Sequence, residues 1–267
     1  MPELPPLVDV HCHLLPGIDD GAADLETALA MAQLAVADGI DTVVVTPHQQ
    51  GAFHRNDGAT IRARTEEFAA ALAAHEIPLR VLPGADVRIE PELVRGVLSG
   101  QIVSLGDHRR HVLLELPHEL YLPLEGLLDD LASARMTGVL SHPERNLGIL
   151  QRPEVLRPLV EAGCLMQVTA GSLLGAFGPR IEAFSIWLLK QGLIHLVASD
   201  AHGLTSRRPL LSPAHRRIAA LTDEATAERL CSTVPLAIAE GRAVTVAQAS
   251  PAGPPRHRRW LGLRRAA

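Results

Sequence analysis

Short apolar segments alternate with longer amphipathic segments along most of this chain. Leu7–Val10, Asp41–Pro47 and Leu79–Gly84 have the aliphatic and β-branched character of buried strands. The segments between them carry apolar residues at helical spacing, and one of these, Asp24–Asp38, is followed by Gly39, a common helix terminator. The first third of the sequence therefore predicts strands that alternate with helices.

The same alternation continues through most of the remaining sequence. Further strands are expected at His111–Pro117, Thr137–Pro143, Cys164–Ala170 and His195–His202. Further helices are expected at Ala59–His75, Pro91–Ser99, Leu122–Met136, Pro153–Ala162, Pro179–Gln191 and Pro213–Glu240. Roughly seven strand–helix units predict an α/β fold whose parallel strands close into a barrel, with an open doubly wound sheet as the alternative.

The composition agrees with an aliphatic interior and narrows the choice of partner. Hydrophobic residues make up 47% of the 267 residues, whereas aromatic residues make up only 3%, so helices are expected to pack on the sheet through aliphatic side chains. A chain of this length can form one large domain. The formal net charge of −5 gives no electrostatic case for nucleic-acid binding, which leaves small molecules and peptides as the expected partners.

The cysteines and the absence of targeting signals favour the cytoplasm. Cys12, Cys164 and Cys231 are widely spaced and odd in number, which is unlike a disulfide framework. No apolar run reaches the ~18 residues of a membrane span. The opening residues "MPELPP" also lack the basic and apolar regions of a secretory signal. We therefore expect a cytoplasmic protein.

Side chains that can bind metals occur where the predicted strands end. A single histidine or aspartate at such a position is most often a turn or cap residue. Many of them at one edge of a sheet predict a metal centre, because divalent cations need imidazoles and carboxylates that converge from several elements. The residues at these strand ends are His11, His13, His48, Asp86, Glu115, His142, Asp200 and His202.

The segment "HCH" gives the most specific local prediction. Alternation along a strand places His11 and His13 on one side and Cys12 on the other, so that two imidazoles can bind one metal. A cysteine-dependent phosphatase would need an arginine six residues after its nucleophile, and none of the cysteines has one. Neither the G-x-x-x-x-G-K-[ST] phosphate loop nor the H-E-x-x-H helix occurs. Nucleophilic catalysis by cysteine is therefore not expected.

Taken together, these motifs resemble those of a known superfamily. The segments "DVHCHLLPGIDDG", "TPH", "SHPER" and "ASDAH" are similar to motifs of the PHP (polymerase and histidinol phosphatase) superfamily. They most closely resemble the manganese-dependent tyrosine-protein phosphatases encoded with bacterial capsule and exopolysaccharide genes. The resemblance runs from about Val8 to about Ala239. It implies a distorted (β/α)7 barrel over residues 1–245 that hydrolyses phosphotyrosine with a trinuclear cluster of manganese, with iron or zinc as alternatives.

The resemblance also implies a set of metal ligands. It favours Asp20 over the neighbouring Asp19 in the "DDG" segment. In "GADVRI", Asp86 stands where the family usually has a glutamate that bridges two metals. A side chain one methylene shorter must therefore make this bridge. The implied ligands are His11, His13, Asp20, His48, Asp86, Glu115, His142, Asp200 and His202.

Two arginines match family positions that bind phosphate. They are Arg145 in "HPER" and Arg207, with Arg208 as the alternative to the latter. A planar guanidinium can bond two phosphate oxygens at once, and these arginines are the implied catalytic residues. The competing interpretation of Arg145 is a surface residue paired with Glu144. Clustered cations would supply the remaining chemistry, by binding phosphoryl oxygens and lowering the pKa of a water.

The resemblance implies a substrate as well. It is the phosphotyrosine-containing tail of a membrane-associated tyrosine kinase that regulates capsule or exopolysaccharide synthesis. The alternatives are a small-molecule phosphoesterase acting on histidinol phosphate or a nucleotide, and an inactive metal-bound regulator. The segment 246–267 is rich in proline, glycine and arginine, which is typical of a disordered extension. Its arginines around Trp260 also suggest weak contact with an anionic membrane surface.

Overall fold

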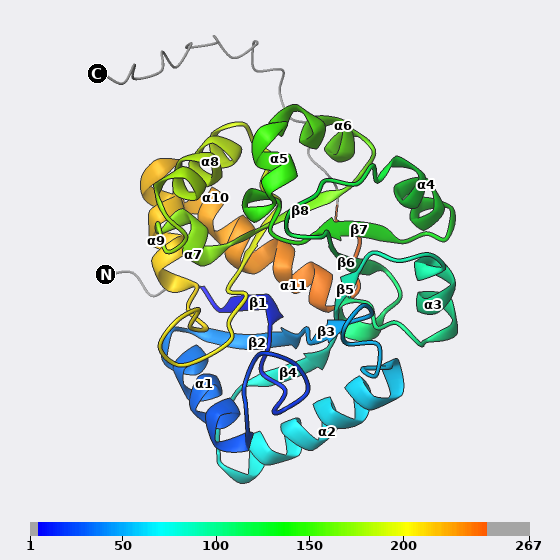
Figure 1. Ribbon diagram of the computed structural model, residues 1–267. Helices are drawn as coiled ribbons and strands as arrows, with labels where there is room; N and C mark the ends of the chain where they lie inside the picture. Colours follow the sequence, from blue (N-terminus) through cyan, green and yellow to red (C-terminus); the bar gives the residue numbers. More distant parts are fainter. Residues whose placement is uncertain (1–4, 245–267) are drawn as a thin grey trace, which may run out of the picture.

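The structure, a computed structural model that describes residues 5–244, is a ring of parallel strands surrounded by helices (Figure 1). The strands are β1 (Leu7–Cys12), β2 (Ile40–Val45), β3 (His48–Gln49), β4 (Arg80–Pro83), β5 (Asp86–Arg88), β6 (His111–Glu115), β7 (Thr137–Leu140), β8 (Leu165–Thr169) and β9 (Leu196–Ala198). The longer helices are α1 (Leu25–Ala37), α2 (Gly58–Ala74), α4 (Glu125–Ser133), α8 (Pro179–Lys190) and α9 (Ser212–Leu221). The shorter ones are α3 (Leu93–Ser99), α5 (Leu147–Gln151), α6 (Leu156–Glu161), α7 (Ala170–Leu173), α10 (Glu224–Glu228) and α11 (Val234–Ala239).

Four further helical turns complete the secondary structure of these residues. Three of them are 3₁₀ turns, η1 (Leu105–Asp107), η2 (Pro143–Arg145) and η3 (Pro153–Val155), and the fourth is a π-helical turn, η4 (Arg229–Thr233).

The strands form a circuit of parallel neighbours. One sheet has the order β1-β2-β4, and the other has the order β3-β5-β6-β7-β8-β9. The two sheets join because β3 and β5 follow β2 and β4 after short breaks, and the Asp86 N–H donates to the Pro47 carbonyl across the junction. A parallel bridge between Cys12 and Ala201 brings β1 back beside the chain that leaves β9. The prediction of a distorted barrel with seven strand positions is confirmed, and the open-sheet alternative is wrong.

Two layers of apolar side chains stabilise this barrel. An outer layer, which includes Val43 and Leu114, packs the strands against the surrounding helices. An inner layer fills the ring itself and includes Leu113, Leu196 and Ile238, the last contributed by α11. In Figure 1, α11 crosses the middle of the ring, where it contacts β1 and β9. Because Leu196 is the first residue of β9, this aliphatic filling lies toward the end where the strands begin.

A β-bulge near the end of β1 orients the first two histidines. The pairing of β1 with β2 shifts register between Asp9 and Cys12, so β1 contains an extra residue there. Val10 belongs to the inner layer, and Cys12 packs in the outer layer. His11 and His13 both turn toward the interior, where their Nε2 atoms lie 3.2 Å apart. The predicted placement of the two imidazoles on one side, with the cysteine opposite, is confirmed.

The expectation of one continuous helix over Pro213–Glu240 is wrong. The structure breaks this segment after α9, and α10, η4 and α11 then follow one another without a gap. Thr222 leaves the helical conformation, with ψ of −96°, and Asp223 begins α10 by accepting the Thr226 N–H at 2.7 Å. Pro235 directly follows the π-helical turn η4, whose last bond is the Val234 N–H donating to the Arg229 carbonyl, so the wider turn lies where proline interrupts the regular helical bonds. The sequence pattern also did not predict α5, α7, β3 or β5, since two to five residues carry little periodicity.

Within residues 5–244, no helix is long and apolar enough to cross a lipid bilayer. The predicted basic tail, 246–267, lies outside the described residues, as does residue 245 at the end of the predicted catalytic unit.

Candidate metal centre

The nine residues predicted as metal ligands lie together at the carboxyl ends of the barrel strands. They form four overlapping groups, and within each group one possible ligand atom per residue lies within 4.8 Å of the others. Each of the nine residues belongs to at least one group. The groups are His13, Asp20, His48 and His202; His11, His142 and Asp200; His11, His13 and Asp86; and His48, Asp86 and Glu115.

Backbone conformation helps to aim two of these side chains. His142 follows β7 with φ of 32°, and Asp200 follows β9 with φ of 51°, so both occupy the left-handed region that is costly for residues other than glycine. The Asp200 N–H donates to the His11 carbonyl at 2.8 Å, and the His142 N–H donates to Oε1 of Gln167 at 3.3 Å. These bonds hold the strained turns beside β1 and β8. Such strain is typical of a site whose side chains must point in one direction.

The two imidazoles of β1 are each fixed by a neighbouring polar side chain. Nδ1 of His11 lies 2.9 Å from Oε1 of Gln167, and Nδ1 of His13 lies 2.7 Å from Oδ2 of Asp19. Because both partners are acceptors, Nδ1 carries the hydrogen in each ring, and Nε2 faces the cluster. Metal-binding histidines are commonly oriented in this way. Gln167 and Asp19 therefore orient candidate ligands without belonging to any of the four groups.

The geometry also separates the two adjacent aspartates. Asp19 is bonded to His13 and accepts the backbone N–H groups of His48 and Gly21, each at 3.0 Å. Oδ1 of Asp20, by contrast, lies 3.4 Å from Nε2 of His48 and also 3.4 Å from Nε2 of His202. This arrangement supports Asp20 as the ligand and gives Asp19 the role of holding His13.

Asp86 has the surroundings expected of a carboxylate that contacts more than one cation. It is fully buried, and neither carboxylate oxygen has a hydrogen-bond partner among residues 5–244. Its Oδ2 lies 3.5 Å from Nε2 of His11 and 3.6 Å from Nδ1 of His48, and it belongs to two of the four groups. Burial, and then the nearby carboxylate of Glu115, raises the pKa of Asp86 to about 8. Cations would offset both effects, so the shorter aspartate fits a metal centre.

The protonation tendencies of the neighbouring groups differ across the cluster. Burial lowers the pKa of His11 to about 3, and burial together with the charge of Arg145 lowers the pKa of His142 well below its usual range. Both imidazoles are therefore neutral, which is the form that binds metals. Burial acts to raise the pKa of Asp200, yet the imidazoles of His11 and His13 and the Arg145 guanidinium outweigh it and hold that pKa well below its usual range. Burial also acts to lower the pKa of His13, but hydrogen bonds to two carboxylates outweigh it and raise that pKa to about 10, so a cation would have to displace a proton from this ring.

Both predicted arginines converge on one carboxylate of the cluster. Nη1 of Arg145 is paired with Oδ2 of Asp200, and Nη2 of Arg207 lies 2.5 Å from Oδ1 of the same residue. The suggested pairing of Arg145 with Glu144 is wrong, because Glu144 is buried and accepts bonds from a backbone N–H and a serine hydroxyl instead. Arg208, the alternative to Arg207, is exposed. Two guanidinium groups therefore lie directly beside the candidate metal ligands.

The cysteines are poorly suited to nucleophilic chemistry. Cys12, Cys164 and Cys231 are all buried and free. Burial raises the pKa of Cys12 well above its usual value, and raises those of Cys164 and Cys231 to about 12. None of the three thiols would be ionised near neutral pH.

The sequence reasoning missed several residues that shape the site. Gln167 fixes His11, and Asn56 donates to the carbonyls of His48 and Ile18 at 2.9 and 3.1 Å. Phe177 lies beneath the Arg145 guanidinium, with 4.7 Å between Cζ and the ring centroid. Only Gln167 had a sequence signal, since it is an amide within an apolar strand segment. The other two lie in loops, where no periodicity marks them.

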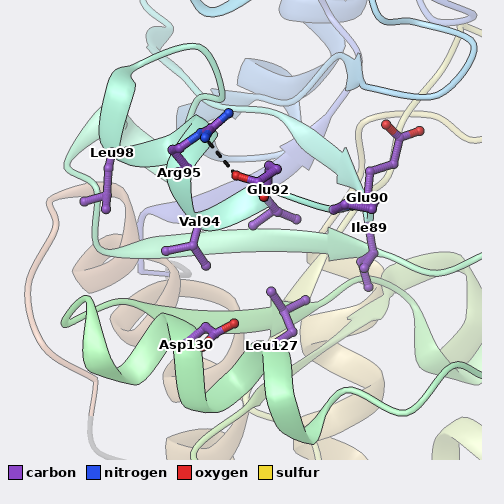
Figure 2. A pocket seen from close by; sticks show the side chains of 10 residues that line it. Ile89, Glu90, Glu92, Val94, Arg95, Leu98, Leu127 and Asp130 are labelled. Atoms are coloured by element: carbon purple, nitrogen blue, oxygen red, sulfur yellow. Dashed lines mark ion pairs between the residues drawn. The ribbon is translucent and has the colours of Figure 1, made fainter.

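A separate groove lies on the flank of the barrel, between α3 and α4 (Figure 2). It has a volume of about 620 Å³, with Val94 on the α3 side and Leu127 on the α4 side. An ion pair of 3.1 Å joins Glu92 and Arg95 on its wall. None of its lining residues is one of the nine candidate ligands, so cavity size alone does not locate the chemistry of this protein.

Comparison with known proteins gives consistent matches over most of the chain. Residues 7–240 match the family model described as "Capsular polysaccharide synthesis, CpsB/CapC". The chain is 40% identical over 203 residues to tyrosine-protein phosphatase YwqE of Bacillus subtilis (strain 168), which covers 75% of this chain and 79% of that protein. It is 30% identical over 202 residues to the putative tyrosine-protein phosphatase CapC of Staphylococcus aureus, with the same coverage of both chains.

A solved structure is similar over nearly the whole fold. It comes from work on YwqE from Bacillus subtilis and CpsB from Streptococcus pneumoniae, described as unique metal-dependent tyrosine phosphatases. The TM-score is 0.87 at 34% sequence identity, and the match covers 93% of this chain and 100% of the other. The barrel and its strand ends therefore have a close structural counterpart.

Proposed function

Because this chain belongs to the CpsB/CapC family of capsular polysaccharide synthesis proteins, we propose that it is a metal-dependent protein-tyrosine phosphatase. The observation that carries the proposal is the convergence of nine histidine, aspartate and glutamate side chains, with two arginines beside them, at one end of the barrel. Relatives at 40% and 30% identity are named as tyrosine-protein phosphatases, and the similar solved structure is described as metal-dependent. The absence of an ionisable cysteine is consistent with a mechanism that does not use a thiolate.

The expected cofactor is a cluster of about three divalent ions, with manganese preferred and iron or zinc as the alternatives. The overlap of the four groups supports more than one ion, because His11, His13, His48 and Asp86 each belong to two groups. When bound, such cations would supply positive charge for the phosphate dianion and would favour ionisation of a water near neutral pH.

The chain's own residues orient the substrate and shape the site. Arg145 and Arg207 can each offer two parallel N–H groups to phosphoryl oxygens, and Asp200 holds both guanidinium groups at the edge of the cluster. Asp19 and Gln167 keep the β1 imidazoles in one tautomer. Because these groups are fixed before substrate binds, little reorganisation is needed when negative charge redistributes over the phosphoryl oxygens in the transition state.

The proposed substrate is a phosphotyrosine tail of a membrane-associated tyrosine kinase in the cytoplasm. The family's link to capsular polysaccharide synthesis supports this choice over histidinol phosphate or a nucleotide. The placement of Asp86 in two groups argues against an inactive regulator, because the glutamate-to-aspartate difference leaves the carboxylate within reach of both. The basic sequence of 246–267 supports weak contact with an anionic membrane surface as a further proposal.

The direct experiment is hydrolysis of a phosphotyrosine peptide by the purified chain before and after removal of metal. We expect activity to be lost after dialysis against EDTA and restored by Mn²⁺. The same protein should release phosphate from the peptide faster than from histidinol phosphate or a nucleotide. Full activity after exhaustive chelation would contradict the metal dependence, and a preference for the small substrates would contradict the assignment as a protein phosphatase.

A further inference from the structure

A pocket opens beside the two arginines, on the side of β8 and β9. We call it the β8–β9 pocket; it has a volume of about 600 Å³. Its apolar wall comes from the turn after α7 and from the start of α9, and Arg207 forms part of its lining. The lining includes Leu174, Ala176, Phe177, Arg207 and Leu210.

The pocket begins where the candidate phosphate site ends. Arg207 lines the pocket and is also paired with Asp200 of the metal-ligand cluster. Phe177 lines it too, and its ring carries the Arg145 guanidinium on one face, 4.7 Å from the ring centroid. A phosphoryl group held by both arginines would therefore have an apolar cavity next to it, and that cavity would receive the group to which the phosphate is attached.

The lining chemistry suits a planar aromatic group. Leu174, Ala176, Phe177 and Leu210 present carbon surface, while Thr205, Ser206 and the charged Arg208 line it from the adjoining loop. Leu174 is 44% exposed, which leaves apolar surface available to a ligand. An aromatic ring gains from burial against such carbon and from edge or offset contact with another ring. A phosphoserine or phosphothreonine in the substrate has a side chain too short to make these contacts.

A second cavity next to the cluster is less suited to the aromatic ring of a phosphorylated substrate. It has a volume of about 360 Å³, and its lining includes the carboxylates of Glu90 and Glu115. The guanidinium of Arg88 also lines this cavity, but neither Arg145 nor Arg207 does, so the cavity does not adjoin the proposed phosphate site through either of those arginines. The ring of Phe53 is already stacked on His48, with 5.3 Å between the centroids.

We propose that the β8–β9 pocket binds the aromatic ring of the substrate's phosphotyrosine, and that Leu174 and Phe177 make the site specific for tyrosine. The proposal rests on the phosphatase function proposed above. The phosphoryl group would contact Arg145, Arg207 and the cations that the cluster would hold, and the ring would lie along the wall formed by the turn after α7. Specificity would then come from the pocket, and catalysis would come from the cluster.

The test is to fill the pocket without touching the cluster. Ala176→Trp places an indole in the β8–β9 pocket, and Ala52→Trp places the same side chain in the cavity on the opposite side as a matched control. Both alanines are exposed, so neither substitution disturbs the core. The substrates are a phosphotyrosine peptide and phenyl phosphate, which has the ring without a peptide. Inorganic phosphate, used as a competitive inhibitor, reports on the phosphate site alone.

We expect Ala176→Trp to lower kcat/KM roughly 10- to 100-fold for both substrates, with metal content and the inhibition constant of inorganic phosphate unchanged. Ala52→Trp should stay within about threefold of the wild type, since its effect is confined to a cavity outside the proposed path. Leu174→Ser, a milder change on an exposed residue, should lower kcat/KM several-fold and replaces Ala176→Trp if that variant does not fold.

Three results would overturn the proposal. The first is near wild-type kcat/KM for both pocket variants, and the second is a larger loss in Ala52→Trp than in Ala176→Trp. The third is a loss with the peptide but not with phenyl phosphate, which would assign the pocket to a residue flanking the phosphotyrosine. A wild-type protein that hydrolyses neither substrate with metal bound would instead contradict the proposed function itself.

Discussion

The two ends of this barrel are built from the same strands, but one end is packed with aliphatic side chains and the other gathers buried polar side chains. Along β6, Leu113 packs in the aliphatic inner layer, and Glu115, two residues further on, belongs to a candidate metal-binding group. At the end where the strands begin, α11 adds Ile238 to that inner layer, and the barrel is filled. At the other end, buried polar atoms such as both Asp86 oxygens lack a protein partner among the described residues. One end is therefore built for stability, and the other accepts unfavourable burial that a bound cation would offset.

Histidine occurs at both ends, which shows that residue type alone does not make a site. His111 and His195 lie at the beginnings of β6 and β9, and burial lowers the pKa of each to about 4. Nδ1 of His195 simply accepts the Met166 N–H at 3.0 Å. The rings of His11 and His13 at the opposite end have centroids 5.3 Å apart and face several carboxylates. Convergence of several ligand-type side chains distinguishes the two environments.

The largest effect is expected from changing the cluster itself. Asp86→Ala removes a carboxylate that two groups share, so metal content should fall and kcat/KM for a phosphotyrosine peptide should drop on the order of 10³-fold. The free energy of unfolding of the metal-free protein should stay the same or rise, because a buried carboxylate without a partner is removed. Elemental analysis, steady-state kinetics and urea unfolding would check this. Unchanged metal content would place Asp86 outside the metal centre.

Arg145→Ala should affect catalysis without affecting the metals. Loss of a bidentate, charge-assisted contact to the phosphoryl group should cost about 2–4 kcal/mol in the transition state, or roughly 30- to 1000-fold in kcat/KM. Arg145→Lys should recover little of this, because an ammonium keeps the charge but not the planar fork. The measurement is kcat/KM with metal content in the same samples. A fully metallated Arg145→Ala protein with near wild-type kcat/KM would leave phosphate binding to Arg207 and the metals.

Leu113→Ala should show the opposite pattern in the aliphatic inner layer, although its strand register partner is Asp86. It removes a fully buried side chain from the inner layer and should lower the free energy of unfolding by roughly 3 kcal/mol. Well below the unfolding temperature, kcat/KM should stay within a few-fold of the wild type. Urea unfolding paired with kinetics measures both. A large loss of activity in a well-folded Leu113→Ala protein would show that the two ends are not independent.

A smaller effect is expected from pH. His195 is neutral in the folded protein down to about pH 4, whereas an unfolded histidine has a pKa near 6.5, so between these values the unfolded chain binds more protons. The contribution of His195 to stability is therefore complete above about pH 6.5 and is lost as the pH falls toward 4. By pH 5 the loss of this contribution should have lowered the free energy of unfolding by about 1–2 kcal/mol.

The variant His195→Gln keeps an acceptor for the Met166 N–H but does not titrate. Its free energy of unfolding should fall less than that of the wild type between pH 7 and pH 5. The matched control is His75→Gln at the exposed end of α2, which makes the same substitution on the surface. If the free energy of unfolding fell equally with pH in the wild type and in His195→Gln, the lowered pKa of His195 would be contradicted.

The smallest effect is expected from thiol reagents. All three cysteines are buried, with thiol pKa values raised by burial, so iodoacetamide should neither label the native protein nor reduce its activity. Mass spectrometry after incubation measures the labelling directly. Rapid inactivation that inorganic phosphate prevents would indicate a cysteine in the active site.

Much of the barrel could be predicted from sequence because each buried strand leaves an apolar segment that ends in a ligand-type residue. The helix over Leu25–Ala37 was also recognisable, since Asp24 caps it and Gly39 follows it. The register shift in β1 could not be read from the sequence, because a bulge adds a residue without changing the apolar pattern. Likewise, the arginines were identified by motif, but their shared contact with Asp200 depends on how two distant turns meet.

The most direct test of the account is to measure bound metal and phosphatase activity together while Mn²⁺ is added back to chelated protein. The cluster at the carboxyl ends of the strands predicts that phosphotyrosine hydrolysis rises with bound metal and reaches its maximum with more than one ion per chain. His142→Ala should bind less metal and reach a lower maximum, whereas Arg145→Ala should bind the wild-type amount. Full hydrolysis by the metal-free wild type would contradict the central claim that this end of the barrel is a catalytic metal centre.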